Sequence, residues 1–324
     1  MNTSVAIVSA GFHSVLDPAA DQAGAIDVVW QWMLWICVPM YALVLIGIVA
    51  AVWRLRAVRR EHPQPTPGDL ALTRGLALWT ALIALGLIAL TAASFLVDRR
   101  LIPSGDAALD VRITGHQWWW QIEYLNPDVS QQFTTANELH LPLGKKVHIE
   151  LRSNDVIHSF WVPNLSGKRD LIPGRVNEIE LTPRRVGLFR GVCAEFCGLQ
   201  HAQMALLVSV DDDAAFETWR TRQVGAARSP AEGIARAGEA IFVSGACAMC
   251  HSVRGTSAAS NAGPDLTHLA SRRTLAAGAL PLDRGSLAAW LSAPQQIKPG
   301  TNMPKVDLAP DQLNALVAYL ATLE

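Results

Sequence analysis

The chain has 324 residues, of which 50% are hydrophobic and only 17% are charged, and its formal net charge is −1 at pH 7. This length suits two or three domains, and the charged fraction lies well below the roughly 25% of soluble proteins, which indicates buried membrane segments. The balanced charge excludes a globally basic surface for nucleic acid and gives no acidic excess of the kind found in disordered chains.

Two long runs without a charged residue, 28–53 and 75–97, come first along the chain. Each exceeds the roughly 20 apolar residues that a helix needs to cross a bilayer. Tryptophans stand at both edges of the first run, as in an interfacial aromatic belt: Trp30, Trp32, Trp35 and Trp53. The runs predict a two-helix membrane anchor. Buried core helices of a soluble protein are the alternative, but the polar residues are too few for an exposed face.

The charges around the first run predict how the anchor lies in the membrane. The connection 54–74 contains five arginines, and the residues before the first run contain no Lys or Arg: Arg54, Arg56, Arg59, Arg60 and Arg74. Because positively charged loops stay inside, we expect this loop in the cytoplasm and both termini on the periplasmic side of a bacterial cell membrane. Arg99 and Arg100, after the second run, argue weakly for the reverse. Residues 1–20 lack the basic start of a signal peptide, and their cleavage stays open.

From 109 to 210 the sequence changes to short segments with alternating apolar positions. These positions are Val111, Ile113, Trp118, Trp120 and Ile122, then Val147, Ile149 and Leu151, then Val176, Ile179 and Leu181. Turn residues separate the segments: Asn126-Pro127, Pro142 with Gly144, Pro173-Gly174 and Pro183. This pattern is typical of an antiparallel β-sandwich or barrel, and the length fits a sandwich.

A set of soft metal ligands lies within this β-rich part. Two thiols, an imidazole and a thioether come close together near its end, those of Cys193, Cys197, His201 and Met204. A second imidazole, His158, comes from a separate predicted strand end. Thiolate, imidazole and thioether together favour copper, whereas zinc sites rarely use Met and calcium or magnesium would prefer oxygen ligands.

The second cysteine needs its own explanation, because a mononuclear blue-copper site uses one Cys, two His and a Met. A second thiolate on the same loop can bridge two metal ions, which predicts a dinuclear copper site that shares one unpaired electron. No coordination position is left open for a substrate, so the site is expected to relay electrons. The alternative is a Cys193–Cys197 disulfide in an oxidising compartment, which leaves the His and Met residues unexplained.

These residues resemble the dinuclear CuA site of haem–copper oxidase subunit II, which is carried on a cupredoxin fold. The resemblance implies that two thiolates bridge both copper ions, those of Cys193 and Cys197. It also implies that His158 and Met204 complete one ion and that His201 completes the other.

The resemblance extends to residues that would face other groups in the oxidase. It implies that the Glu195 carbonyl completes the second copper ion and that the Glu195 side chain reaches a magnesium ion at the boundary with subunit I. The run 115–120 matches the aromatic stretch of the family and makes Trp118 the residue at which electrons enter, although strand aromatics are ordinarily core residues. One departure is the segment 75–80, which lacks the carboxylate that many members place near the mouth of a proton channel. Asp69 is the nearest carboxylate, and proton uptake through this subunit stays open.

The sequence Cys247-Ala248-Met249-Cys250-His251 contains C-x-x-C-H, the attachment motif of c-type haem. In this motif two thiols form thioethers with the haem vinyl groups, and the adjacent histidine becomes the proximal iron ligand. Redox or zinc chemistry of the cysteine pair is the alternative for a cytosolic chain. The outward topology and the following His251 favour covalent haem.

The second axial ligand of the haem iron is expected from Met303, the only methionine after the motif. It lies in a Pro/Gly loop before a final amphipathic helix at 311–320, where class I cytochromes c present theirs, and His/Met ligation raises the reduction potential. His268 is the rival ligand and is expected to be structural. Residues 231–324 resemble that cytochrome family in length and in the helices at both ends.

These predictions divide the chain into an N-terminal segment with a two-helix anchor (1–104), a cupredoxin domain (105–212), a connector (213–230) and an all-α cytochrome c domain (231–324). The resemblance implies a respiratory oxidase subunit that passes electrons from its fused haem c to the dinuclear copper and on to subunit I, where oxygen is reduced and protons are pumped. The implied partners are subunits I and III, an electron donor that is a cytochrome or membrane reductase, and membrane lipid, with no nucleic acid.

Three other functions share features with this sequence. Nitrous oxide reductase shares the copper motif but is soluble and needs a His-rich catalytic domain that this sequence lacks. Quinol oxidase subunit II shares the anchor and the β-domain but lacks the copper ligands. A free-standing, membrane-tethered electron-transfer protein without an oxidase partner is the remaining alternative, and copurification with a large haem-containing subunit would discriminate it.

Overall fold

The computed structural model describes residues 12–58 and 70–324. These residues form two compact units, one made of 24–102 and one that joins the residues up to Ala23 with those from Pro103 on. Each unit is described by itself.

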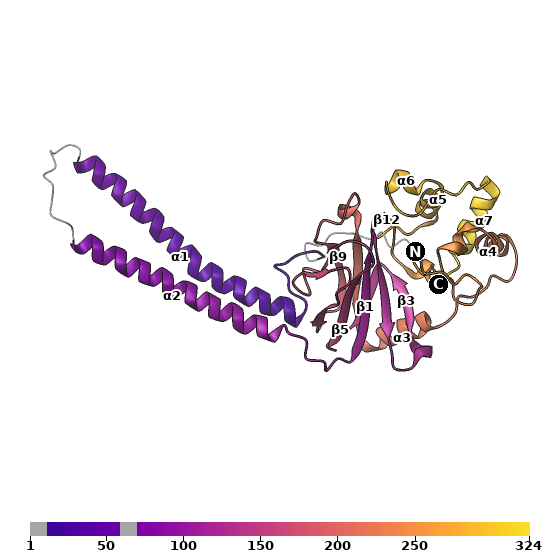
Figure 1. Cartoon of the computed structure of the whole chain (residues 1–324), viewed down its shortest axis with the longest axis horizontal. Helices are drawn as coiled ribbons and strands as arrows, with labels where there is room; N and C mark the ends of the chain where they lie inside the picture. Colours follow the sequence, from indigo (N-terminus) through magenta and orange to yellow (C-terminus); the bar gives the residue numbers. More distant parts are fainter. Residues whose placement is uncertain (1–11, 59–69) are drawn as a thin grey trace. The chain divides into compact units, whose positions relative to one another are not determined.

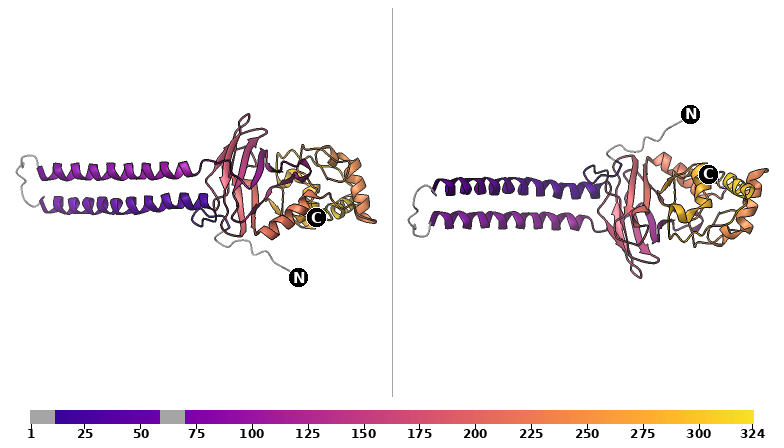
Figure 2. Two further views of the ribbon diagram at one scale, coloured as in Figure 1. Left: turned by 90° about the horizontal axis from the view of Figure 1, so that it is seen from below. Right: turned by 90° about the horizontal axis from the view of Figure 1, so that it is seen from above.

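The first unit is a helical hairpin made of α1 (Asp21–Val58) and α2 (Leu70–Arg100), which run side by side in both views of Figure 2. Both helices are long and apolar enough to cross a membrane, with mean hydropathies of 2.4 and 2.3. Gly86 of α2 lies beside α1, where a Cβ would make an ordinary contact with Ile36 Cγ2 at 3.5 Å. The two apolar helices expected from the sequence are therefore confirmed. Arg59, Arg60 and Asp69 lie outside the described residues.

Ten strands form a sandwich in the second unit (Figure 1). They are β1 (Leu109–His116), β2 (Trp119–Leu125), β3 (Phe133–Ala136), β4 (Glu138–Pro142), β5 (Val147–Ser153), β6 (His158–Trp161), β7 (Arg169–Leu171), β8 (Asn177–Leu181), β9 (Gly187–Cys193) and β10 (Ala205–Asp211). One sheet has the order β3-β2-β1-β5-β8 and the other β4-β10-β9-β6-β7. The predicted β-sandwich is confirmed.

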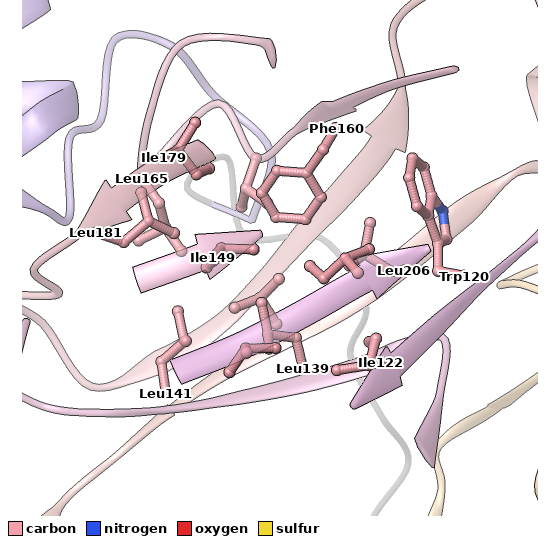
Figure 3. Packing of buried hydrophobic residues seen from close by; sticks show 14 of the residues in the cluster. Trp120, Ile122, Leu139, Leu141, Ile149, Phe160, Leu165, Ile179, Leu181 and Leu206 are labelled. Carbon is pink, nitrogen blue, oxygen red and sulfur yellow. The ribbon is translucent and has the colours of Figure 1, made fainter. Parts of the chain in front are cut away.

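Alternation along the strands builds the core between the two sheets. Inward-facing side chains such as Trp120, Ile149 and Phe160 are fully buried, and Figure 3 shows them packed from both sheets. Burying apolar surface in this way is the main stabilising contribution to such a domain. On β2 and β5 the alternate positions stay partly exposed, as one-sided burial requires.

The sandwich is not purely antiparallel, which corrects the expectation. β1 pairs with β5 in parallel, and β10 pairs with β4 in parallel. The reason is that the chain moves to the second sheet at β4 and returns at β5, so that β5 runs in the same direction as β1. The run 111–122 is likewise two antiparallel strands, with His116 opposite Trp119 and Gln117 and Trp118 in the turn between them.

Residues 12–23 also pack on the sandwich, ahead of the membrane hairpin. Ala19 and Ala20 belong to its buried core, and Arg184 makes a two-point ion pair with Asp21, with N–O distances of 2.7 and 2.6 Å. Arg185 does the same with Asp17, at 2.8 and 2.7 Å. A soluble fragment that began at the first strand would lose these contacts.

The rest of the second unit is helical. It contains α3 (Asp213–Val224), α4 (Ile234–Ser244), α5 (Arg284–Ser292), α6 (Pro294–Ile297) and α7 (Pro310–Leu320), with two short strands, β11 (Thr274–Leu275) and β12 (Leu280–Pro281). The Asp212 side chain caps α3, and Phe216 of α3 enters the sandwich core. α4 packs on α7 at Gly238, where a Cβ would lie 2.0 Å from the Ala315 carbonyl oxygen, so only glycine allows this crossing.

Candidate copper and haem sites

The candidate copper ligands come from three places that the second sheet brings together. His158 is the first residue of β6 and Cys193 the last residue of β9, and the two strands pair antiparallel, with Phe160 opposite Cys193. The loop after β9 then carries Cys197 and His201 and returns to Met204, whose carbonyl accepts a hydrogen bond from the Cys193 amide at 2.9 Å. A backbone hydrogen bond thus joins the two ends of the loop.

The ligand atoms lie close to one another. The Cys193 and Cys197 sulfurs are 3.7 Å apart, and both are free thiols. His158 Nδ1 lies 3.9 Å from Cys193 Sγ. His201 Nδ1 lies 3.7 Å from Cys197 Sγ, and Met204 Sδ lies 3.9 Å from Cys197 Sγ.

These distances fit a metal centre. The ligand atoms of His158, Cys193 and Cys197 all lie within 4.8 Å of one another, and atoms that each bond one ion at about 2.0–2.3 Å can be nearly that far apart. His201 lies outside this group, on the Cys197 side. A donor set with one imidazole close to each of two thiols fits two ions better than one.

The environment favours a thiolate at the site. The hydrogen-bonding contact with Cys197 holds the pKa of Cys193 well below its ordinary value, and the His158 ring lowers it further. The neighbouring Cys193 sulfur raises the pKa of Cys197. A thiolate is the form that binds metal, so the pair favours binding of a soft metal ion.

Two residues that sequence reasoning missed hold the His158 ring in place. Asp155 Oδ1 lies 2.7 Å from His158 Nε2, the carboxylate–histidine arrangement that orients metal-binding imidazoles. Gly115 of β1 makes room for the ring, since a Cβ there would lie 2.8 Å from His158 Cδ2. The spacing of Asp155 and His158 was a usable signal in the sequence, whereas the role of Gly115 depends on a contact between distant strands.

Glu195 presents its two functional groups to different surroundings. Its backbone oxygen lies 3.2 Å from Cys193 Sγ, within the copper-ligand group. Its half-exposed carboxylate pairs with Lys168 at 3.8 Å. On the same loop Phe196 and Leu199 are 75% and 71% exposed, so this surface offers apolar and acidic groups together.

Trp118 lies directly beside the copper-ligand loop. It occupies the turn between β1 and β2 and is 8% exposed. Its Nε1 donates to the Cys197 carbonyl at 2.9 Å, and the Gln117 amide donates to the same oxygen at 2.7 Å. The indole is therefore one hydrogen bond away from a candidate copper ligand.

The haem motif begins in the short helix η3 (Ala246–Met249). His251 Nδ1 donates to the Pro264 carbonyl at 2.8 Å, which orients the ring and leaves Nε2 as the ligand atom. Gly263 allows this, because a Cβ there would lie 2.9 Å from His251 Cε1. Burial lowers the pKa of His251, which favours the neutral imidazole that binds iron. Cys247 and Cys250 are half-buried free thiols, so these residues fit a covalent haem.

The two rival axial ligands differ in how they are held. Met303 lies on the loop after α6 and packs against the hydrophobic cluster of the helical region, and its carbonyl accepts from Gln295 at 2.9 Å. His268 is buried with both ring nitrogens occupied, by the Glu324 carbonyl at 2.8 Å and the Gly225 carbonyl at 3.1 Å. His268 thus ties the C-terminal end to the connector after α3.

Two known families match the chain. Residues 125–210 match the family described as "Cytochrome C oxidase subunit II, periplasmic domain". Residues 235–324 match the family "Cytochrome c". The candidate copper ligands fall within the first match and the haem motif within the second.

Relatives extend the similarity over nearly the whole chain. A protein named cytochrome c oxidase subunit 2 from Alkalihalophilus pseudofirmus is 33% identical over 321 residues, covering 96% of this chain and 91% of the relative. Its namesake from Bacillus subtilis is 30% identical over 338 residues, covering 97% and 92%. Among solved structures, the periplasmic domain of subunit II of cytochrome oxidase from Bradyrhizobium japonicum is 32% identical and covers 38% of this chain and 96% of that one, with a TM-score of 0.35.

Proposed function

The chain belongs to the cytochrome c oxidase subunit II family and carries a cytochrome c domain at its C-terminal end, and from this we propose that it relays electrons from a fused haem c through a dinuclear copper centre to subunit I, where oxygen is reduced to water and protons are pumped. Membership makes it a subunit of a haem–copper respiratory oxidase, a membrane protein of electron transport with copper and haem.

Six residues would hold the copper. Cys193 and Cys197 would bridge two ions, with His158 and Met204 completing one, and His201 and the Glu195 carbonyl completing the other. The thiols, 3.7 Å apart with one imidazole close to each, support this assignment. When bound, copper and haem supply one-electron redox chemistry. The protein residues hold that geometry fixed, which keeps reorganisation small.

The haem would be attached through Cys247 and Cys250, with His251 and Met303 as axial ligands of its iron. The hydrogen bond from His251 to the Pro264 carbonyl supports the proximal role. Met303 is supported by its place on a loop packed against the hydrophobic cluster, and the backbone contacts of His268 give that residue a structural role instead.

We further propose how the chain sits in its complex. The divisions at 104, 212 and 230 would separate anchor, cupredoxin domain, connector and cytochrome domain, with both termini and both redox domains on the periplasmic side. Subunits I and III and membrane lipid would surround the anchor, and a cytochrome or membrane reductase would supply electrons. The half-exposed Glu195 carboxylate would take part in a magnesium site shared with subunit I.

One observation carries this function: the contact of Trp118 with the copper-ligand loop. Its indole donates to the Cys197 carbonyl at 2.9 Å, and a Cβ on Gly300, in the loop before Met303, would lie only 3.5 Å from the same ring. The loop that bears the proposed haem ligand Met303 and the loop that bears the proposed copper ligands therefore both contact the Trp118 ring. Trp118 is accordingly proposed as the residue at which electrons enter the copper centre.

The test uses the full chain, purified in detergent with any bound subunits after expression with haem c maturation. Metal and haem analysis should give two copper ions and one covalent haem per chain. Electron paramagnetic resonance should show one electron shared by two equivalent copper nuclei. A large haem-containing subunit should copurify. One haem with no copper would overturn the relay, and a fully loaded chain that purifies alone from its native membrane would indicate a free-standing electron carrier.

A further inference from the structure

A buried lysine lies where the helical region meets the sandwich. Lys298 is 2% exposed, and its Nζ donates to the carbonyls of Trp118 at 2.7 Å, Gln203 at 2.9 Å and Ala276 at 2.9 Å. An ammonium has three N–H donors, and here all three are used. Among the described residues no carboxylate lies within ion-pair distance of it.

Such a group is costly unless it is fully hydrogen-bonded. Burial lowers the pKa of Lys298 to about 7. The three carbonyls therefore have to accept the hydrogen bonds that water would accept from an exposed lysine. Two of the three carbonyls belong to the sandwich, at Trp118 and at Gln203, which directly precedes Met204. The third belongs to the helical region. One cation therefore joins both sides at the copper-ligand loop.

The carbonyl from the helical region is presented by an unusual turn. Ala276 and Ala277 have φ of 52° and 59°, and Gly278 has φ of 82°, so two alanines adopt the left-handed conformation that non-glycine residues seldom adopt. The turn aims Ala276 O at Lys298 and Ala277 O at the Ala205 amide at 3.0 Å. Backbone strain of this kind persists where surrounding contacts impose it.

Further contacts join the helical region to the sandwich beside Lys298. Gln200 Nε2 donates to the Pro299 carbonyl at 2.7 Å. The buried carboxylate of Glu138 accepts from the Arg273 amide. Gly300 lies over Trp118 and Leu199, since a Cβ there would be 3.5 and 3.2 Å from them. The segment 298–300 thus covers the ring of Trp118.

We propose that Lys298 is a positioning residue that fixes the loop bearing Met303 on Trp118, so that this chain's own haem domain occupies the surface at which electrons enter the copper centre. The proposal rests on the proposed function and adds how the fused haem domain is held at Trp118. The step is a one-electron transfer in which the haem domain is oxidised and the copper centre reduced. A free cytochrome would have to deliver its electron to the haem domain first.

The test compares the full chain with Lys298→Met, which retains an unbranched apolar side chain and removes the ammonium. Lys305→Met is the matched control, because Lys305 is exposed and pairs only with Asp307, at 3.0 Å. Hydrogen exchange is measured on peptides covering 117–119, 203–205 and 298–303, with 251–264 as an internal reference. Faster exchange in the first three segments of Lys298→Met, with the reference unchanged, is the expected result.

Electron transfer supplies the second measurement. After flash reduction of the haem, transfer to copper should slow roughly tenfold or more in Lys298→Met, since a misplacement of about 1 Å can already be costly to a reaction. The reduction potentials of both centres should stay unchanged. A small soluble cytochrome should reduce copper directly in this variant and not in the parent. The milder Gln200→Ala serves the same comparison where Lys298→Met folds poorly.

The outcomes separate the proposals. Unchanged hydrogen exchange at 117–119 and 298–303 in Lys298→Met would overturn the positioning role of Lys298, whatever the cofactor content. Faster exchange with an unchanged rate of transfer would overturn the route through Trp118. Loss of copper from the parent chain would defeat the proposed function instead, while the exchange measurement, which needs no copper, would still decide the role of Lys298.

Discussion

The copper-ligand region and the haem motif hold their residues in contrasting ways. The copper candidates come from the start of β6, the end of β9 and the loop before β10. His158, Cys193, Cys197 and Met204 are buried, with exposures of 0 to 5%, whereas His201 and Glu195 are partly exposed. The haem cysteines and His251 lie within five consecutive residues and are only partly buried. The candidate copper ligands thus come together only when the sandwich folds, whereas the residues of the haem motif are already adjacent in the sequence.

The largest expected effect tests whether these two sites are independent. Changing Cys247 and Cys250 to Ser together should abolish covalent haem completely and leave copper bound, because no residue of the copper set lies in the motif. Changing Cys193 and Cys197 to Ser should do the reverse. Haem staining after denaturing electrophoresis and copper analysis of the same sample measure both outcomes.

A chain that lost both cofactors when either cysteine pair was changed would contradict this independence. Cys37→Ser is the control, since that thiol lies exposed on α1 and should leave both cofactors in place.

The second prediction separates the two rival ligands of the haem region. Met303→Ala should remove the spectral band of Met-ligated ferric haem and lower the reduction potential, because the thioether raises it. His268→Ala should leave the band and cost about 1–3 kcal/mol of stability, since it removes a buried side chain and its hydrogen bonds to the Glu324 and Gly225 carbonyls. Absorption spectra and thermal unfolding are the measurements.

If His268→Ala removed the band while Met303→Ala retained it, the ligand assignment would be reversed.

The third prediction uses two glycines that make room for the two imidazoles. In Gly115→Ala a Cβ would meet the His158 ring at 2.8 Å, and in Gly263→Ala one would meet the His251 ring at 2.9 Å. Overpacking costs about 1–3 kcal/mol, which corresponds to roughly 5- to 150-fold in affinity. Gly115→Ala should therefore weaken copper binding by that factor, and Gly263→Ala should disturb only the haem spectrum.

Gly75→Ala is the control, because nothing lies within 4 Å of a Cβ at that position. Equal copper affinity in Gly115→Ala and Gly75→Ala would show that the His158 ring can move aside at no cost.

The same contrast explains what could be predicted from the sequence. The two apolar runs, the alternating strands and the contiguous motif are periodic or local signals, and each predicted its part of the fold. The ligand identities around Cys193 could be grouped because they lie on one loop. Gly115 and Lys298 could not be found, because their roles arise from contacts with His158 and Trp118, which only the folded chain brings near. The parallel pairing of β1 with β5 was missed for the same reason.

The smallest expected effect concerns the carboxylate behind His158. Asp155→Ala removes the oxygen 2.7 Å from His158 Nε2 and the partner of the Gln117 amide at 2.6 Å, so the imidazole loses its fixed orientation. Loss of such an outer partner typically weakens metal binding, here by about tenfold. Copper competition titration measures the affinity.

Asp110→Ala is the matched control, because Asp110 makes a similar contact with a histidine that is no copper candidate, His148, at 3.1 Å. That variant should retain the parent affinity. Equal losses in the two variants would mean that removing any carboxylate from these strands weakens copper binding through charge alone. A loss confined to Asp155→Ala would show that the copper site depends on a residue outside its ligand set. The contiguous haem motif, held by covalent bonds, should show no such dependence on the sandwich.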